Sequence, residues 1–387
     1  MPPYGRRMDI RLLPLAEVTD GDARAWQALA AGALAPNMCL DPRFLLTARA
    51  RPDAHEVRVL AAVEGGAWLG ALAVTTKRVT PRLPVRALTT GGAFMTSQCD
   101  RHHPLLHRDR ADEALDALLR GAPTVGLPGL ALLRRFPAEG PVAEVLDRVA
   151  ARRRMRVHER SRDVGAWAPR AAFDVLPVPA PVEGVVVDPP LSTAHLRTDD
   201  ARNVRRVARG LARELGGPLE LRDESDDPAA VDRFVALQAA GWKGDPARGG
   251  AAVGLDAADE RWFRDMVAAF RRDGDLDALR LTAGGETIWA GFHVRSGRGW
   301  FGLLDAYDER FRRFSPGSVG RLAGLTYLLG TTDAPFVDPG FGSHYAVGAR
   351  LWPAARPQVD LLVGARGPAA RAVLRAVPLA RRLGVAT

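Results

Sequence analysis

Two segments of the chain repeat one pattern, and this repeat constrains the fold more than any other feature of the sequence. Each segment begins with a run of apolar residues, passes through a Gly-Gly pair, and continues into a second apolar run with Trp two residues before Gly. The segments cover residues 57–74 and 279–294, with the glycine pairs at 65–66 and 284–285. Glycine pairs favour the tight turns of β-hairpins. The repeat therefore predicts two β-hairpins in related halves of the chain.

The helical patterns around the hairpins agree with a duplication. A short helix with Trp26 and Leu29 precedes the first hairpin, and a helix over 112–120 follows it. Three helices are predicted before the second hairpin, over about residues 200–215, 227–241 and 256–270. The second of these is expected to begin with Asp227 as its N-cap. The third has Asp256 followed by Asp259 and Glu260 in its first turn, where carboxylates oppose the helix dipole. Each half is therefore expected to be an α+β domain, with helices packed on a mostly antiparallel sheet.

The length of the chain agrees with two domains. The sequence has 387 residues, and domains commonly contain about 100–200 residues. A proline-rich stretch at residues 175–184 cannot form the interior of a helix and is typical of a linker. We therefore expect domains over 1–175 and 176–387.

The net charge of the chain is weak evidence for a nucleic-acid partner. The formal charge is +9, but only Lys77 and Lys243 among the 54 basic residues are lysine. Together with the abundant Ala, Gly and Pro, this preference for Arg indicates GC-rich coding. The positive balance alone therefore does not predict the basic surface of a nucleic-acid-binding protein.

The remaining composition excludes several classes of protein. The two cysteines, Cys39 and Cys99, exclude a disulfide framework and a thiolate metal cluster. No uncharged apolar run approaches the ~20 residues of a membrane-spanning helix. The N-terminal residues lack the apolar stretch of a signal peptide. We expect a cytoplasmic protein without a membrane span.

A candidate anion site follows the second hairpin. Residues 299–308 are predicted to form a strand that ends in polar residues, and a helix is predicted over 319–329. The turn between them contains Arg312-Arg313 and Ser315-Pro-Gly. The N-terminus of a helix presents unpaired backbone N–H groups to an anion, and arginines add charge-assisted contacts to phosphate. Ser-Pro-Gly also begins many helices that bind nothing, so both interpretations stay open.

The order of helices, hairpin, strand, small-residue turn and helix resembles the Gcn5-related N-acetyltransferase (GNAT) fold. In that family the turn after the fourth strand holds the pyrophosphate of coenzyme A, in the pattern Arg/Gln-x-x-Gly-x-Gly/Ala. Arg312 and Gly317 match the first and last positions, and Ser315 replaces the middle glycine. The resemblance implies that Arg312, Arg313, Ser315, Gly317 and Ser318 bind acetyl-CoA or another acyl-CoA, and that no metal is needed.

Residues from about 190 to 345 resemble more closely the GNAT branch named for CelD of cellulose biosynthesis, which is related to the FemAB aminoacyltransferases. The shared motifs are Arg202-Asn203-Val-Arg205-Arg206, Trp242-Lys243, Tyr307-Asp308, Ser315-Pro316-Gly317 and Asp338-Pro-Gly340-Phe-Gly342 with Tyr345. The chain departs from the branch at Ala346, where Lys is usual, and at His344, where an acidic or neutral residue is common. The resemblance implies tandem GNAT-like domains, the first degenerate and the second an acyltransferase.

Acyl transfer from a thioester to an amine needs a base, a stabilised oxyanion and a protonated leaving thiol. The candidate bases are His293, Asp305 and His344, which we expect to approach one cleft. Histidine has the better intrinsic pKa, about 6.5, and Asp305 would need desolvation. Tyr345 or Tyr327 is a candidate proton donor to the thiolate, although Tyr327 lies on an apolar helix and fits a core position. In this fold the oxyanion donor is usually a backbone N–H of the fourth strand, here around 303–305.

These candidates also have structural interpretations. His293 fits an outward-facing polar position, Asp305 a turn cap, and His344 a surface loop. Trp242, Tyr307 and Asp308 are candidate residues for binding the acceptor substrate, although a buried Trp is common. Five arginines on the predicted helix at 200–215 form either a solvated face or a surface for phosphates or RNA: Arg202, Arg205, Arg206, Arg209 and Arg213.

The sequence therefore predicts a cytoplasmic N-acyltransferase that transfers an acyl group, with acetyl as the first choice, from acyl-CoA. The acceptor is an amine of a small molecule or of a sugar or peptide precursor. One alternative is a FemAB-like enzyme that takes the acyl group from aminoacyl-tRNA. Another is a binding protein that kept the GNAT fold without catalysis.

Overall fold

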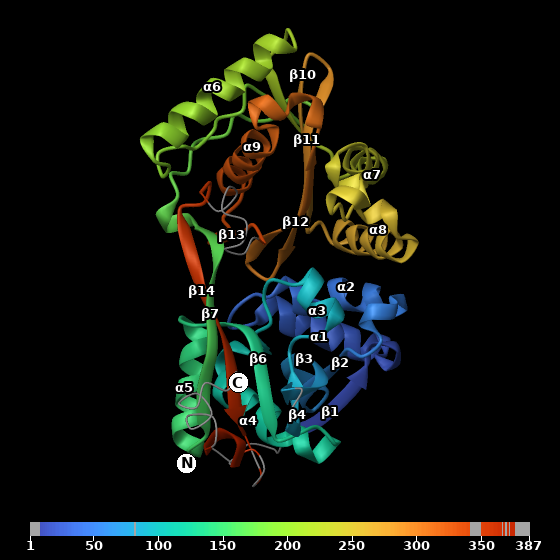
Figure 1. Cartoon of the computed structure of the whole chain (residues 1–387), viewed down its shortest axis with the longest axis vertical. Helices are drawn as coiled ribbons and strands as arrows, with labels where there is room; N and C mark the ends of the chain where they lie inside the picture. Colours follow the sequence, from blue (N-terminus) through green and yellow to red (C-terminus); the bar gives the residue numbers. More distant parts are fainter. Residues whose placement is uncertain are drawn as a thin grey trace. The chain divides into compact units, whose positions relative to one another are not determined.

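The computed structural model describes residues 8–375 except 81, 82, 341–349, 366, 368, 369 and 371. The chain divides into two compact units (Figure 1). The first comprises the residues up to Val164 together with those from Arg356 onward, and the second comprises Gly165–Ala355. The boundary near residue 175, between a degenerate GNAT-like domain and an acyltransferase domain, stays a prediction.

The first unit is built on a sheet with the strand order β1-β2-β3-β4-β6-β14-β7. Its strands are β1 (Asp9–Pro14), β2 (Arg58–Glu64), β3 (Ala67–Thr80), β4 (Leu83–Thr89), β5 (Leu105–Leu106), β6 (Leu130–Pro137), β7 (Arg156–Pro169) and β14 (Ala354–Gly364). Its helices are α1 (Asp20–Gly32), α2 (Pro42–Leu45), α3 (Ala93–Gln98), α4 (Ala111–Gly121) and α5 (Pro141–Arg153). Strands β1 to β4 are antiparallel neighbours, whereas β4 and β6 run parallel.

The second unit repeats this arrangement. Its strands are β8 (Val185–Val187), β9 (Leu219–Asp223), β10 (Leu276–Ala283), β11 (Glu286–Ser296), β12 (Gly299–Tyr307) and β13 (Phe336–Asp338). Its helices are α6 (Thr198–Glu214), α7 (Ala230–Ala240), α8 (Ala257–Arg272) and α9 (Pro316–Thr331). Strands β8 to β12 are antiparallel neighbours, and β13 runs parallel to β12. The expected α+β fold class is confirmed.

Both predicted hairpins are present. Strands β2 and β3 enclose the turn at Gly65 and Gly66, and strands β10 and β11 enclose the turn at Gly284 and Gly285. All four glycines have positive φ angles, between 54° and 87°. Such angles are strained for residues with a side chain, which explains why both turns need a glycine pair.

The helices of the second unit start close to where the sequence predicts. Helix α6 begins at Thr198, and Asp256 caps α8 by accepting hydrogen bonds from the backbone N–H groups of Ala258 and Asp259. The prediction that Asp227 is the N-cap of α7 is wrong, because that helix begins at Ala230. Asp227 instead accepts a hydrogen bond from the backbone of Ala229 in the turn before the helix.

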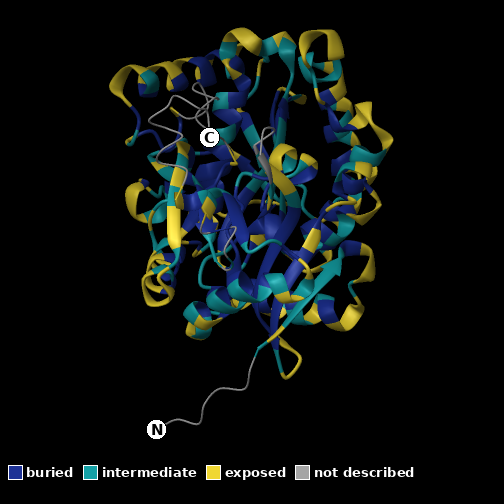
Figure 2. Ribbon diagram, turned by 60° about the horizontal axis from the view of Figure 1, so that its bottom comes forward, coloured by how far each residue is buried: buried dark blue, intermediate teal, exposed yellow. Residues whose placement is uncertain are grey.

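The core of the second unit lies between the strands and α9, and the strands in Figure 2 are mostly buried while the helices expose their outer faces. Trp289 of β11 is fully buried in this core. A Cβ atom on Gly320 of α9 would lie only 2.2 Å from the indole Cγ. Helix α9 therefore packs on Trp289 because residue 320 has no side chain. Among the described residues, no helix combines the length and hydropathy needed to cross a membrane.

We expect Gly320→Ala to lower the free energy of unfolding by about 1–3 kcal/mol or more, because the added methyl group overlaps the indole. Unfolding in urea measures this effect. Gly241→Ala is the control, since its Cβ would meet its nearest atom, Glu309 Cγ, at an ordinary 3.5 Å. Equal losses in the two variants would contradict the packing of α9 on Trp289.

Candidate active site

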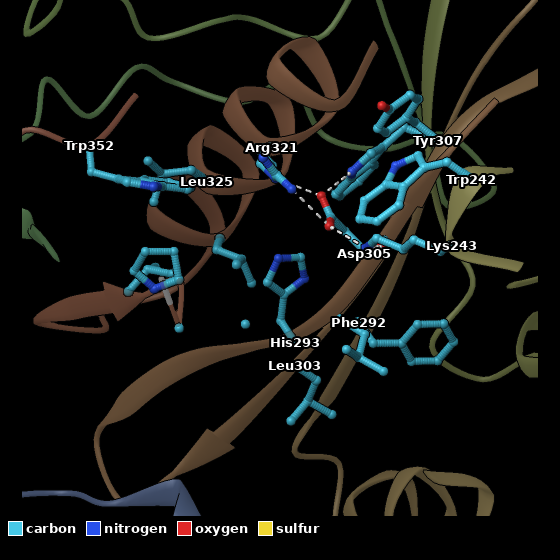
Figure 3. A pocket seen from close by; sticks show the side chains of 17 residues that line it. Trp242, Lys243, Phe292, His293, Leu303, Asp305, Tyr307, Arg321, Leu325 and Trp352 are labelled. Atoms are coloured by element: carbon cyan, nitrogen blue, oxygen red, sulfur yellow. Dashed lines mark hydrogen bonds and ion pairs between the residues drawn. The ribbon is translucent and has the colours of Figure 1, made fainter. Parts of the chain in front are cut away.

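The second unit contains a cavity of about 300 Å³ at the point where two parallel strands separate. Strand β13 pairs with β12 at Trp300 and Phe301, before β12 continues to Tyr307. The cavity is lined by β11, the second half of β12, α9, the segment after β13, and the residues Trp242, Lys243 and Trp352 (Figure 3). One wall of the cavity is thus the second half of β12, which does not pair with β13.

A β-bulge in β12 adds to this exposed backbone. In the register with β11, Phe292 lies opposite Leu304 and His293 lies opposite Gly302, which leaves Leu303 without a partner. Leu303 lines the cavity. Bulges interrupt the hydrogen-bond ladder of a sheet and often lie beside active sites. Neither neighbouring strand, within the part of the chain that the structure describes, has a residue in register with Leu303.

Asp305 of β12 is the centre of a buried polar cluster at one side of the cavity. Its carboxylate accepts a hydrogen bond from Arg321 Nε at 2.6 Å and another from an Arg321 terminal nitrogen at 3.0 Å. The indole Nε1 of Trp289 donates to Asp305 Oδ2 at 3.0 Å. Lys243 Nζ lies 3.7 Å from Oδ1 and donates to the Asp305 backbone carbonyl at 2.7 Å. Arg321 and Lys243 therefore converge on one carboxylate (Figure 3).

The pKa values of Asp305 and Lys243 depend on burial and on the charges that the two side chains share with Arg321. Burial disfavours the Asp305 carboxylate, but Arg321 and Lys243 outweigh burial and hold its pKa at about 2. Burial also lowers the pKa of Lys243, against the attraction of Asp305. When Lys243 is protonated, it and Arg321 place two cations beside the Asp305 carboxylate. In that state the cluster has a surplus positive charge that favours a developing negative charge in the cavity.

His293 of β11 points into the same cavity (Figure 3). Its Nδ1 is buried and has no hydrogen-bond partner among the described residues. Burial lowers the pKa of His293 to about 4, although the charge of Asp305 and the backbone of Asp277 act in the opposite direction. The imidazole is therefore neutral at pH 7 and has a ring nitrogen available for a ligand.

A second buried polar group lies beside His293 on the neighbouring strand. Asp277 of β10 is opposite His293 in the strand register, and burial and the charge of Asp223 raise its pKa to about 7. Tyr327 of α9 donates a hydrogen bond to Asp223 at 2.9 Å, and burial raises the tyrosine pKa. Two carboxyl groups, one of which has a pKa near neutral pH, thus lie on β9 and β10 and outside the lining of the cavity.

The structure brings together part of the predicted site. His293, Asp305, Trp242 and Tyr307 all line the cavity. Asp308 does not line it and caps the following 3-10 helix, Glu309–Phe314, by accepting from Arg310 N. His344 and Tyr345 lie outside the described residues, as does Ala346. Among the described residues, no group of three or more His, Cys, Asp or Glu side chains is placed to hold a metal ion.

The five residues predicted to bind coenzyme A lie at the start of α9, apart from the residues that line the cavity. Ser315 is the N-cap residue and has a φ angle of 48°. Gly317 packs against the ring of Tyr307, while Arg313 forms an ion pair with Glu214. Arg312 and Arg313 are exposed. Their roles stay a prediction.

Sequence reasoning missed Arg321 and the role of Lys243 in the cavity. The sequence contains one weak indication of each, since Lys243 is one of only two lysines and Arg321 is a charged residue in the largely apolar segment 316–331. The predicted arginine-rich helix is α6, and Arg202, Arg205, Arg206, Arg209 and Arg213 are all exposed. Its opposite face is buried, as in a helix packed on a sheet.

Comparisons with known proteins agree with this architecture. Residues 199–326 match the model of an acetyltransferase (GNAT) domain. FemX has a similar structure, with a TM-score of 0.56 and 11% identity over 88% of this chain and 95% of that chain. No curated protein matches the chain in sequence.

Two further solved structures are similar. The C-terminal domain of a putative lysylphosphatidylglycerol synthetase from Agrobacterium fabrum has a TM-score of 0.52 and 12% identity over 93% of this chain and 96% of that chain. A protein of unknown function from Bacteroides thetaiotaomicron has a TM-score of 0.53 and 12% identity over 92% of this chain and 99% of that chain. The expected resemblance to the GNAT superfamily is confirmed for residues 199–326, and the similarity to FemX shows a shared fold.

We expect Asp305→Asn to lower the free energy of unfolding by about 3–5 kcal/mol, because Arg321 and Lys243 would keep buried charges without a carboxylate. Unfolding in urea at pH 7 measures the loss. Asp308→Asn is the control, since its ion pair is with the largely exposed Arg310 and surface pairs contribute about 0–1 kcal/mol. A similar small loss in both variants would contradict the buried cluster.

The pH dependence of stability should reveal the opposed groups Asp277 and His293. Because the pKa of Asp277 in the folded protein is raised to about 7, the group makes its full contribution to stability at pH values below the ordinary pKa of an aspartate. This contribution is lost as the pH rises to 7. Because the pKa of His293 in the folded protein is lowered to about 4, the neutral imidazole makes its full contribution to stability above about pH 6.5, the ordinary pKa of histidine. This contribution is lost as the pH falls to 4. Between pH 4 and 6.5 the two contributions oppose each other.

In Asp277→Asn only the His293 contribution remains. The free energy of unfolding of this variant should therefore fall more steeply than that of the wild type as pH is lowered from 6.5 to 4. Urea unfolding at several pH values measures the slopes. Parallel slopes for the two proteins would show that these groups do not have the opposed pKa shifts.

Proposed function

We propose that this protein, a GNAT-superfamily acyltransferase with the fold of FemX, transfers an acyl group from acyl-CoA to the amine of a small molecule or of a sugar or peptide precursor. Acetyl-CoA is the expected donor. The observation that carries the proposal is that one cavity combines an unpaired strand backbone, a neutral histidine and a cationic cluster.

The strand backbone and Lys243 provide stabilisation for the oxyanion. When the amine attacks the thioester carbonyl, negative charge develops on the carbonyl oxygen, and fixed N–H donors and cations lower the energy of that state. The backbone N–H of Leu303 is the proposed donor, because the bulge leaves this residue without a partner in β11. Lys243 and Arg321 supply the positive field, while Asp305 holds both side chains in place.

His293 is the proposed base. An attacking ammonium group must first lose a proton, and the unpartnered Nδ1 of His293 is a neutral acceptor in the cavity wall at pH 7. The charge of Asp305 would stabilise the imidazolium that forms. Asp305 itself is a poor base because its pKa is about 2. We therefore assign it the positioning of Arg321 and Lys243 instead.

The reaction then releases the coenzyme. The new C–N bond forms, the C–S bond breaks, and the thiolate takes a proton, for which Tyr345 stays a candidate. The apolar side of the cavity, with Leu325, Leu328 and Trp352, fits the acyl chain. The start of α9, with exposed Arg312 and Arg313, is the proposed site for the phosphates of the donor.

A second candidate donor is aminoacyl-tRNA, as the resemblance to FemAB aminoacyltransferases implies. The observation that favours it is the row of five exposed arginines on α6, which suits a polyphosphate backbone. The replacement of the middle glycine of the coenzyme pattern by Ser315 also permits a donor other than coenzyme A.

Binding measurements on the full chain distinguish the donors. We expect acetyl-CoA to release heat in a calorimetric titration and to raise the melting temperature, and Arg312→Gln/Arg313→Gln to weaken its binding about tenfold or more. Arg261→Gln/Arg272→Gln is the matched control, since both arginines are exposed on α8 and lie away from the turn.

Other outcomes reject the first donor. No response to acetyl-CoA, together with strongly salt-dependent binding of charged tRNA, would favour aminoacyl-tRNA as donor. The absence of binding by either donor would favour a GNAT-fold binding protein. Equal weakening in the two arginine variants would move the phosphate site away from the start of α9.

A further inference from the structure

The first unit contains a larger cavity that the proposed reaction does not use. Its volume is about 860 Å³, and all of its lining residues lie between Glu56 and Arg160. It is lined by residues of β3, the end of β4, α3 and β6, the strand that pairs parallel with β4 at Leu88 and Thr89. The first unit thus has its own cavity.

The lining of this cavity is strongly basic. It includes Lys77, Arg78, Arg134 and Arg160, against the single acidic residue Glu56. Lys77 and Arg78 are exposed on β3, and neither forms an ion pair with a described residue. A chain that uses arginine almost everywhere places one of its two lysines here. Cations that have no partner inside the protein are available to an anionic ligand.

Arg134 is held in place by a bulge and a carboxylate. In the register of β6 with β14, residues 134 and 135 lie at an irregularity, and Arg135 has a φ angle of 42°. Asp360 of β14 fixes this bulge, because Oδ1 accepts from the backbone N–H of Arg135 at 2.9 Å and Oδ2 pairs with Arg134 Nε at 2.6 Å. Left-handed backbone at arginine is strained, and such strain gathers at binding sites.

Arg134 keeps donors free for a ligand. Its Nε is paired with Asp360, while its two terminal nitrogens have no partner among the described residues. Its side chain is 38% exposed. An arginine held at Nε by a carboxylate retains N–H groups that can bind a phosphate oxygen with charge assistance.

The segment Thr89–Gly92 forms the floor beside Arg134. Thr75 donates a hydrogen bond to the carbonyl of Gly91 at 2.8 Å, and the N–H of Gly91 donates to Thr89 Oγ1 at 3.1 Å. A Cβ on Gly91 would lie 3.2 Å from Arg134 Cγ. A residue without a side chain at this position therefore leaves space for the side chain of Arg134. Thr89, Thr96 and Ser97 also line the cavity, and their hydroxyl groups form hydrogen bonds with the backbone of this segment and of α3.

We propose that this cavity is a second ligand site, which binds a small molecule bearing a phosphate or diphosphate group. Arginine and lysine side chains suit the oxygens of phosphate esters, and the volume lies within the range of small-molecule sites. The site goes beyond the proposed acyl transfer, which takes place entirely in the second unit. The first unit is therefore a binding domain rather than only a support for the second.

The test uses inorganic pyrophosphate with the full chain in calorimetric titrations at low and at physiological salt. We expect binding that weakens with salt, and Lys77→Gln/Arg78→Gln to weaken it about tenfold or more. Both side chains are exposed and make no ion pair with a described residue, so this variant should keep its fold. Arg49→Gln/Arg58→Gln is the matched control, since it removes the same charge from exposed positions of the first unit outside the cavity. Arg134→Gln should also weaken binding.

Three results would overturn the proposal. The first is no heat with millimolar pyrophosphate at low salt. The second is sulfate binding as well as pyrophosphate does, which would indicate general attraction to positive charge. The third is binding that survives Lys77→Gln/Arg78→Gln but is lost in Arg312→Gln/Arg313→Gln, which would place the anion at the start of α9. The titration of acetyl-CoA is independent of these results, so failure of this site leaves the acyltransferase proposal unaffected.

Discussion

The carboxylate of Asp305 is the constraint on which the second unit depends. It is buried near the end of β12 and joins β11 through Trp289, α9 through Arg321, and the turn after α7 through Lys243. A carboxylate removed from water needs partners of opposite charge, and these cations need the carboxylate in turn. One ionised group therefore sets the positions of the polar side chains at one side of the cavity. Its low pKa follows from the same contacts.

The cavity forms where β12 stops pairing with β13. Strand β13 pairs with only the first part of β12, and the bulge at Leu303 interrupts the pairing with β11 on the other side. Helix α9 then covers the sheet at a distance set by Gly320 on Trp289. Regular pairing would have filled the space with hydrogen bonds between strands. The interruption leaves backbone groups beside His293 and Lys243, where they can act on a ligand.

Each unit contains a cavity beside a pair of parallel strands, and the two cavities have different linings. In the second unit the cavity is lined by His293 and by a cluster in which Arg321 and Lys243 share the carboxylate of Asp305. In the first unit the cavity is larger, and two of its basic residues, Lys77 and Arg78, form no ion pair with a described residue. If both sites act as proposed, one copy of a duplicated fold binds a phosphate-bearing ligand while the other performs the transfer.

Local patterns in the sequence were enough to predict the hairpins and the start of α8 near Asp256, because each depends on residues close together in the chain. They were also enough to single out His293 and Asp305, which do line one cavity. The start of α7 was predicted wrongly, since Asp227 has the composition of an N-cap but acts in a turn before the helix. The partners Arg321, Lys243, Asp277 and Asp360 were decided only by the tertiary structure. Their roles depend on which side chains meet across strands and helices far apart in sequence, and burial then determines their pKa values and charges.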